Sequence, residues 1–313
     1  MYEVERIVSP EVCKKLIEYN IDTTLKFLIT DIQKLIEITD LSCEELLEIR
    51  IKISKNVHNP NKIIRAVDIV PWRRLSTGCT AINSLIRGGI PVNGIIEIFG
   101  CSGVGKTQFC LQLALQAQLP LHKNGLEKGA VYICTEDVFP SKRFHHLANI
   151  FKAKHNLTEN DFESSVFLKH VTDIQQLQNC LSTELPILFR KENIGLVVVD
   201  SIAGPFRGEN ENEVLARSRE IIDLVTKLKI INEEFKAAVV CTNQVTEDII
   251  KNKTEPCLGL VWTNSINYRC QITRNNNSTL REFQVVFSPD VPTGRCSFSI
   301  TEEGLQNEDC MEY

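Results

Sequence analysis

The octapeptide GCSGVGKT, residues 100–107, is the feature that most restricts how this chain can fold. It stands between the apolar run GIIEIF and the segment QFCLQLALQAQL, so a buried strand, a loop and a helix are expected in succession. Gly100, Gly105, Lys106 and Thr107 satisfy the pattern G-x-x-x-x-G-K-[ST]. The glycines let backbone N–H groups turn inward, and the positive end of the next helix faces the same point. The segment therefore predicts a loop that holds phosphate.

Each part of this loop has an expected role. The Lys106 ammonium would reach the β- and γ-phosphates of a nucleoside triphosphate, and the Thr107 hydroxyl would bind Mg²⁺. The remaining backbone would surround the phosphates, and it belongs to Gly100, Cys101, Ser102, Gly103, Val104 and Gly105.

Polar side chains follow three other apolar runs. Asp200 ends LVVVD, where a carboxylate can hold the hydration shell of Mg²⁺. Glu136 ends VYICTE, from where a carboxylate can polarise the water that attacks a γ-phosphate. VVCTNQ supplies Asn243 and Gln244, either of which offers an amide to sense that phosphate. Because ligands bind at the carboxyl edge of a parallel sheet, we expect these residues to converge on Lys106.

Residues 76–313 have the pattern of an α/β core. Short β-branched runs alternate with helical stretches, which predicts a mostly parallel central sheet. The later segments SINYRCQIT, LREFQVVFS and RCSFSI predict a closing antiparallel meander.

Residues 1–55 predict a small all-α domain, followed by a linker over residues 56–75 that contains the helix breaker Asn59-Pro60. Ser9-Pro10 is typical of a helix start, and Thr30 with Gln33 and Ser42 with Glu45 have capping-box spacing. A helical hairpin that grips a DNA backbone needs glycine, and the first glycine is Gly78. This favours packing or partner binding over DNA binding for the domain.

Composition restricts the partners. The chain of 313 residues has a net charge of −5 and shows no obvious basic face, so any DNA contact must be local. Its twelve cysteines form no C-x-x-C pair, which fits reduced thiols in the cytosol or nucleus. No apolar segment has the length of a membrane span or a signal peptide, so we expect no membrane partner.

The chain resembles the ATPase core of the RecA-type eukaryotic recombinases and their paralogues over residues 75–300. The resemblance rests on STGCTAINSLIRGGIPVNGIIEIFGCSGVGKTQFCLQLALQAQLP, GAVYICTEDVFPSKRF, LVVVDSIAGPFR and VVCTNQVTE. It implies a RecA-like P-loop ATPase fold, ATP and Mg²⁺ as cofactors, a role in homologous-recombination repair of DNA breaks, and assembly with other paralogues and the recombinase. By the same resemblance, Glu136 matches the catalytic glutamate, Gln244 the γ-phosphate sensor and Arg143 a residue near the adenine.

The segments that reach DNA in the recombinases are poor in cations here. After Asp200, Arg207 is followed by three glutamates in PFRGENENEV. The second loop, VTEDIIKNKTEPCL, has no aromatic residue, and its lysines are balanced by acids. The candidate DNA contacts are Arg207, Lys251 and Lys253.

Two features concern contacts between subunits. Recombinases cap a neighbour's ATP with Asp-Ser-Pro-x-x-Pro, whereas this chain begins that motif with Phe287, leaving Asp290 as a possible substitute. Recombinases also dock through Phe-x-x-Ala, and the linker has this spacing in Ile63 and Ala66. Such spacing is common, so a match by chance explains it nearly as well as a docking role does.

A nucleotide site combined with DNA-facing loops that are poor in cations predicts an ATP-binding recombination mediator. We expect this protein to be a subunit of a hetero-oligomer of RecA-like paralogues and to reach single-stranded or branched DNA through that complex. Two alternatives stay open: a self-sufficient DNA-dependent strand-exchange ATPase, and a scaffold that holds ATP without hydrolysing it. A small-molecule kinase is disfavoured, because the sequence lacks a recognisable lid for a phosphate acceptor. We expect weak DNA-dependent ATP hydrolysis, and residence in the nucleus as well as the cytoplasm.

Overall fold

The computed structural model describes residues 4, 7–19, 21, 23–57, 65–69, 71–157, 161–207, 214–248, 253–274 and 279–308. The chain divides into two compact units, Met1–Pro71 and Trp72–Tyr313. Residues 72–75, assigned to the linker from the sequence, belong to the second unit, where Arg74–Leu75 pairs with Ile90–Pro91.

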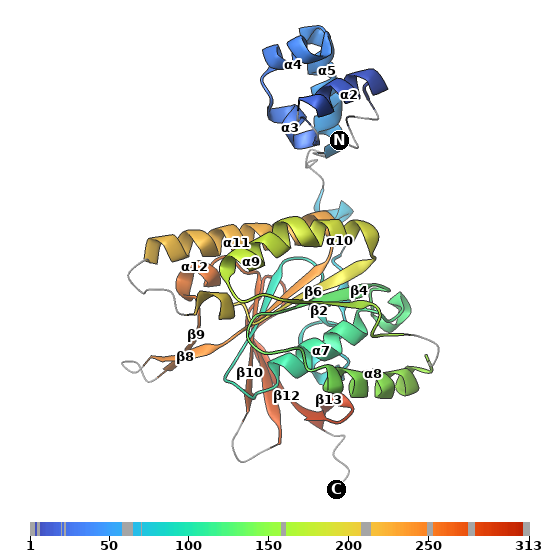
Figure 1. The fold of residues 1–313 in the computed structure, drawn as a ribbon. Coiled ribbons are helices and arrows are strands. Elements are labelled where there is room, and N and C mark those ends of the chain that lie inside the picture. The colour runs from blue at the N-terminus through green and yellow to red at the C-terminus, as the bar shows by residue number, and fades with distance from the viewer. Residues whose placement is uncertain are drawn as a thin grey trace. The chain divides into compact units, whose positions relative to one another are not determined.

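The first unit is helical (Figure 1). Its elements are α2 (Pro10–Glu18), α3 (Thr24–Ile29), α4 (Ile32–Thr39), α5 (Cys43–Val57) and the single turn η1 (Ala66–Asp68). A small core of fully buried side chains holds the helices together, including Leu16, Phe27, Leu35, Leu46 and Ile53. An amphipathic helix of this length needs such packing to be stable.

The predicted helix starts are confirmed at two positions. The Ser9 hydroxyl accepts the Val12 N–H at 3.4 Å at the start of α2. Ser42 and Glu45 form a reciprocal capping box, with the Ser42 N–H 2.9 Å from the Glu45 carboxylate and the Glu45 N–H 3.2 Å from the Ser42 hydroxyl. These bonds from Ser42 lower the pKa of Glu45.

The third predicted start is wrong. Asp31 caps α4, because its carboxylate accepts the Gln33 N–H at 2.9 Å. The Thr30 hydroxyl instead donates to the Lys26 carbonyl oxygen at 2.6 Å, at the end of α3. An ionised carboxylate is the stronger acceptor at a helix start, so the cap lies one residue later than predicted.

The second unit contains a nine-stranded sheet within the described residues, in the order β13-β12-β11-β10-β3-β7-β6-β4-β5. The strands of this sheet are β3 (Ile95–Phe99), β4 (Gly129–Cys134), β5 (Val166–His170), β6 (Ile194–Asp200), β7 (Ala238–Asn243), β10 (Tyr268–Arg274), β11 (Arg281–Phe287), β12 (Gly294–Thr301) and β13 (Gly304–Asn307). Two small pairs accompany it: β1 (Arg74–Leu75) with β2 (Ile90–Pro91), and β8 (Val245–Asp248) with β9 (Lys253–Pro256).

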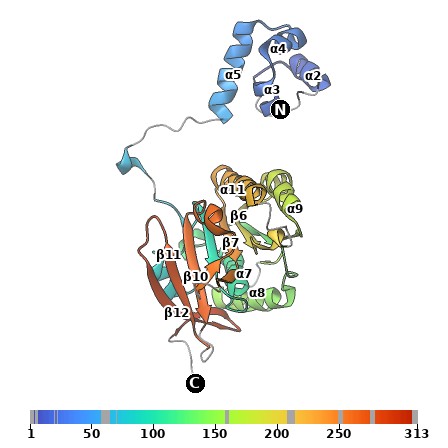
Figure 2. The ribbon, with the colours of Figure 1, turned by 90° about the vertical axis from the view of Figure 1, so that its left-hand side faces the viewer.

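The sheet is parallel from β10 through β3, β7, β6 and β4 to β5. Strands β10 to β13 continue it as an antiparallel meander (Figure 2). The predicted α/β class with a mostly parallel central sheet is confirmed, and so is the closing meander.

Helices cover both faces of this sheet (Figure 1). They are α6 (Thr80–Leu85), α7 (Lys106–Gln116), α8 (Ser141–His155), α9 (Ile174–Asn179), α10 (Leu185–Lys191), α11 (Val214–Phe235) and α12 (Gly259–Thr263), with the short turns η2 (Leu121–Lys123), η3 (Cys180–Glu184) and η4 (Gly204–Phe206). Side chains of α6, α7 and α8 form one buried cluster with the sheet, and those of α9 and α11 form a second. The central strands are buried on both sides, which explains their continuous apolar runs.

None of the helices in the described ranges is long and apolar enough to cross a membrane.

Candidate nucleotide site

The loop between β3 and α7 has the backbone that its glycines predict. Gly105 has φ of +109° and directly precedes α7, and a Cβ there would lie 2.3 Å from the Ile300 Cδ1 atom. A Cβ on Gly100 would lie 2.2 Å from the Ile272 carbonyl oxygen. Gly103 has φ of +75° and open space around it. The loop is therefore tight against the sheet on one side and open on the other, as a phosphate cradle requires.

Lys106 is 9% exposed at the start of α7, and its Nζ donates to the carbonyl oxygens of Gly100 at 2.7 Å and Cys101 at 2.8 Å. Burial lowers the pKa of Lys106, and the charges of Asp200 and Glu136 partly oppose this. An ammonium has three N–H groups. With two carbonyl bonds made, one donor is left for an anion in the loop.

Asp200 gathers three hydroxyl groups at the end of β6. Its carboxylate accepts hydrogen bonds from Thr107 at 2.8 Å, Tyr132 at 2.6 Å and Thr242 at 2.5 Å. The structure thus brings the two predicted Mg²⁺ residues, Thr107 and Asp200, into contact. Tyr132 and Thr242 were missed, although each is a hydroxyl residue inside a run, VYICT or VVCTN, that precedes a predicted site residue. Burial, with Asp200 nearby, raises the pKa of the Tyr132 hydroxyl.

Glu136, Gln244 and Arg207 form a second polar group. The Gln244 side-chain amide donates to Glu136 Oε2 at 2.6 Å, and the Arg207 guanidinium donates to Gln244 Oε1. Glu136 Oε1 lies 3.2 Å from a guanidinium nitrogen of Arg207, yet it is buried and accepts no well-aligned hydrogen bond among the described residues. This oxygen is therefore ion-paired with Arg207 and keeps hydrogen-bonding capacity inside the site.

A cavity of about 160 Å³ joins the two groups. It is lined by Thr107, Tyr132, Cys134, Glu136, Asp137, Val138, Pro140 and Asp200. Nowhere in the described ranges do three His, Cys, Asp or Glu side chains gather as a metal site of their own. The Thr107 hydroxyl and the Asp200 carboxylate do meet at this cavity, and Mg²⁺ commonly takes one or two carboxylates and completes its shell with water and phosphate oxygens. The donor set therefore suits ATP with Mg²⁺.

Arg143, the residue expected near the adenine, lies on α8 against the helix that follows the loop. Its Nε donates to Gln108 Oε1 at 2.8 Å, and its other nitrogens donate to the carbonyl oxygens of Thr301 at 2.7 Å and Glu302 at 2.8 Å. Arg143 thus ties α8 and the turn after β12 to α7, and its contact with adenine stays a prediction.

The chain matches the Rad51 family over residues 71–308. It belongs to the Rad51 family. It is similar to the "DNA repair protein XRCC3" of Bos taurus, with 37% identity over 254 residues that cover 75% of this chain and 74% of the relative. The "DNA repair protein rhp57" of Schizosaccharomyces pombe is 30% identical over 319 residues, covering 86% and 88%. The human "DNA repair protein RAD51 homolog 2" is 29% identical over 336 residues, covering 95% and 86%.

The resemblance seen in the sequence is confirmed by this membership. Two stretches, GLEKGAVYICTEDVFPSKR and CLGLVWTN, most resemble the paralogue called X-ray repair cross-complementing protein three, and relatives of that name from cattle and mouse are 37% and 36% identical.

The two amides at the end of β7 in this Rad51-family chain have different places. Gln244 lies in the site, whereas Asn243 is fully buried and donates to Glu97 Oε1 at 2.6 Å and to the Cys257 carbonyl oxygen at 2.9 Å. Glu97 also accepts from the Trp262 indole at 2.7 Å and is paired with Arg269. The sequence signal for this buried group was the single carboxylate within GIIEIF.

The structure describes only some of the residues that were expected to contact DNA or a neighbouring subunit. Arg207 is bound to Glu136 and Gln244 within the candidate nucleotide site. Lys253 is the first residue of β9, opposite Asp248 in the hairpin, while Lys251 lies outside the described residues. Ala66 is exposed in η1, and Ile63 also lies outside the described residues.

Asp290, the possible substitute for the missing capping carboxylate, is bound within its own chain. It pairs with Arg74 and accepts the Tyr268 hydroxyl at 2.7 Å. Arg74 in turn donates to the carbonyl oxygens of Ile86 at 2.8 Å and Gly89 at 2.9 Å. The Asp290 carboxylate thus links the meander to the β1–β2 pair.

Proposed function

We propose that this Rad51-family chain binds ATP with Mg²⁺ and acts in DNA repair as a recombination mediator, as one subunit of a hetero-oligomer of RecA-like paralogues. The observation that carries this is the convergence of Lys106, Thr107, Asp200 and Glu136, from three distant segments, at the carboxyl edge of one parallel sheet. The relatives named as DNA repair proteins support the process.

The residues divide the work of binding. The loop amides and the remaining Lys106 donor would hold the phosphates. The Thr107 hydroxyl, now bonded to Asp200, would turn its oxygen to the metal, while Asp200 holds metal-bound water. Bound Mg²⁺ supplies the positive charge that neutralises the phosphate oxygens.

Glu136 would orient the attacking water through Oε1, once this oxygen separates from Arg207, and accept a proton from it. The second oxygen is held by Gln244, which itself is bonded to Arg207. A γ-phosphate that attracts the Gln244 amide would break this bond. Turnover would then depend on how Gln244 and Arg207 rearrange, which supports slow hydrolysis, and we propose that DNA stimulates it.

The segments expected to reach DNA are poor in cations, so we propose that this subunit works together with partners. Arg207 is already bound in the nucleotide site, so it adds little positive charge for DNA, and Asp290 is held by Arg74. The partners we propose are other RecA-like paralogues and the recombinase, with single-stranded or branched DNA reached mainly through the complex. We place the protein in the nucleus, and also in the cytoplasm.

The deciding experiment compares Lys106→Ala and Glu136→Gln with the wild type in ATP binding by calorimetry with Mg²⁺ and in repair of DNA breaks in cells that lack the endogenous protein. The mediator requires loss of repair with both variants, whereas ATP binding is lost only with Lys106→Ala. Repair that survives Glu136→Gln and fails with Lys106→Ala would identify the non-hydrolysing scaffold. Strand exchange by the isolated chain would identify the self-sufficient ATPase. ATP affinity unchanged by Lys106→Ala would remove the nucleotide site from the proposal.

A further inference from the structure

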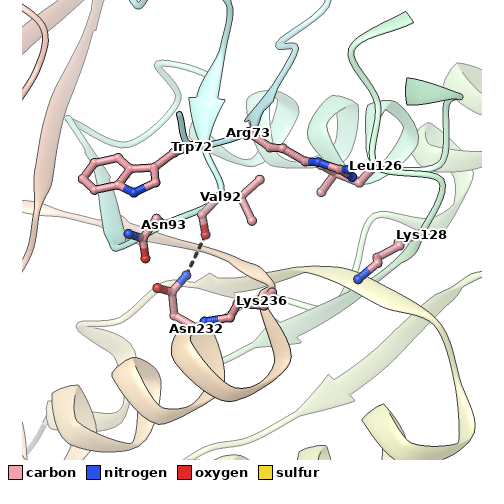
Figure 3. Close-up of a pocket in the computed structure, with 8 residues that line it drawn as sticks. All are labelled: Trp72, Arg73, Val92, Asn93, Leu126, Lys128, Asn232 and Lys236. Carbon is pink, nitrogen blue, oxygen red and sulfur yellow. Dashed lines mark hydrogen bonds between the residues drawn. The ribbon is translucent and has the colours of Figure 1, made fainter. Parts of the chain in front are cut away.

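A second hollow lies at the opposite edge of the sheet from the nucleotide site. It has a volume of about 390 Å³ and is lined by Trp72, Arg73, Val92, Asn93, Leu126, Lys128, Asn232 and Lys236 (Figure 3). These residues precede β1, β3, β4 and β7, so the hollow is at the amino ends of strands whose carboxyl ends carry the nucleotide site. The two sites therefore lie at opposite ends of the same strands.

The lining is cationic although the chain as a whole is acidic. Arg73, Lys128 and Lys236 line the hollow, and none of its lining residues is an aspartate or a glutamate. Within the described part of the chain, no hydrogen bond or ion pair is found for the side chains of these three residues. Figure 3 shows Arg73 and Trp72 on either side of Val92, with Lys128 and Lys236 below them. Three cations around one hollow, without carboxylate partners, favour an anionic ligand.

Trp72 adds a flat apolar surface beside these charges. Trp72 is 48% exposed, whereas the other tryptophan of the chain, Trp262, is fully buried. An exposed indole next to cations can stack on a planar group while the cations hold an attached anion.

The walls of the hollow are held in place by hydrogen bonds. Asn232 is 4% exposed and bonds the Val92 carbonyl oxygen at 2.7 Å, the Ala237 carbonyl oxygen at 2.8 Å and the Gly94 N–H at 2.8 Å. The Arg73 carbonyl oxygen accepts the Val92 N–H at 2.9 Å. A ligand would thus meet a preformed site, which reduces the entropy lost on binding.

Lys236 occupies an unusual backbone position. It follows the last residue of α11 with φ of +53°, in the left-handed region where glycine is the usual residue. Glycine would fit this backbone with less strain, yet the position carries a long cationic side chain that lines the hollow.

We propose that this hollow binds single-stranded nucleic acid, with one base stacked on Trp72 and the adjoining phosphates held by Arg73, Lys128 and Lys236. The volume suits a nucleotide unit, since small-ligand pockets begin at about 300 Å³. An acidic polypeptide shares the charge, but the Asp and Glu side chains that supply it carry no flat ring to stack on the indole. The site acts independently of ATP, and it gives the lone chain a weak, salt-sensitive contact with DNA besides the contacts made through its partners.

Tryptophan fluorescence tests this directly, because Trp72 is the exposed fluorophore and Trp262 is shielded. Titration of the full chain with a (dT)15 oligonucleotide at low salt is expected to quench the emission, with or without ATP. Contacts with three phosphates on a single strand predict a slope of about −2 for log K against log salt. Absence of quenching, or a slope near zero, would contradict the proposal.

Matched variants identify the residues, with affinity measured by anisotropy of a labelled (dT)15. Trp72→Ala and the pair Lys128→Gln with Lys236→Gln should each weaken binding about tenfold, whereas Trp72→Phe, which retains a ring, should stay within about threefold. Lys142→Gln is the control, because this exposed lysine lies on α8 at the other end of β4. Equal losses with Lys142→Gln, or none with the Trp72 and lysine variants, would overturn the assignment.

Two further measurements test alternatives to this proposal. The first alternative is that Lys236 has only a structural role, and the second is that the ligand is an acidic polypeptide. Lys236→Gly should raise the melting temperature and still weaken (dT)15 binding, which a merely structural lysine would not do. Lys106→Ala should bind (dT)15 like the wild type, so failure of the nucleotide proposal is distinguishable from failure of this one. A poly-glutamate peptide that quenches Trp72 while (dT)15 does not would show that the hollow takes an acidic polypeptide, contrary to the proposal.

Discussion

The side-chain amide of Gln244 lies 2.6 Å from the carboxylate of Glu136, although the two residues are 108 positions apart in the sequence. The residue expected to sense the γ-phosphate is thus bonded directly to the residue expected to orient the attacking water. A change in one cannot occur without a change in the hydrogen bonding of the other. Neither residue belongs to the loop of residues 100–107 that is expected to bind the phosphates. We therefore expect that changes at Glu136 or Gln244 can alter hydrolysis without abolishing ATP binding.

Glu136→Gln should therefore reduce ATP turnover about 100-fold, because a neutral amide cannot accept the proton from water. ATP affinity should change less than about threefold, since we expect the loop and Lys106 to hold the phosphates. Steady-state phosphate release and calorimetry measure the two quantities. Glu233→Gln, on the exposed side of α11, is the matched control and should alter neither. Parallel losses of affinity and turnover in Glu136→Gln would show that Glu136 binds the nucleotide instead.

Lys106→Met should stabilise the protein at pH 7 by about 1 kcal/mol while abolishing ATP binding, because it removes a buried charge that has only carbonyl partners. Burial lowers the folded-state pKa of Lys106 below its unfolded value of 10.5. The unfolded chain then binds more protons between these two pKa values, so wild-type stability rises with pH in that window.

The advantage of Lys106→Met should consequently shrink as the pH rises toward 10. Urea unfolding of both proteins at pH 7 and pH 10 measures the change. A variant that is less stable than the wild type at pH 7 would show that Lys106 is well solvated or well paired in the folded protein.

Glu97→Gln should destabilise the protein by about 3 kcal/mol, because Arg269 is 6% exposed and would keep its charge without the carboxylate. The matched control is Glu282→Gln, which removes the partner of the exposed Arg295 at 3.5 Å and should cost less than about 0.5 kcal/mol. Urea denaturation gives both values. Similar small effects at the two positions would mean that the Glu97 group adds nothing to stability.

Local chemistry explains what the sequence could predict. The loop glycines, Lys106 and Thr107 follow from eight adjacent residues, because a phosphate-binding loop of this kind is built from the backbone of consecutive residues. The Ser42–Glu45 box likewise depends on neighbours three residues apart. Asp200 was predictable because a parallel sheet brings the carboxyl ends of its strands to one edge.

Contacts between distant segments were not predictable in this way. Which of Asn243 and Gln244 enters the site depends on the buried Glu97, and its carboxylate takes Asn243. Asp31 caps α4 in place of Thr30, because the Thr30 hydroxyl is hydrogen-bonded to the preceding helix. The hollow around Trp72 depends on Lys236, which is far away in sequence, and no short motif marks it.

Asp290 offers a last test, because two roles for it predict opposite results. The structure pairs Asp290 with Arg74, whose side chain is 14% exposed, and with the Tyr268 hydroxyl. Asp290→Asn should then lower the free energy of unfolding by about 2 kcal/mol, since the Arg74 charge stays largely buried without its carboxylate. ATP affinity of the isolated chain should not change. If Asp290 instead caps the nucleotide of a neighbouring subunit, the variant keeps its stability in urea and loses ATP-dependent assembly with a partner paralogue, as measured by light scattering.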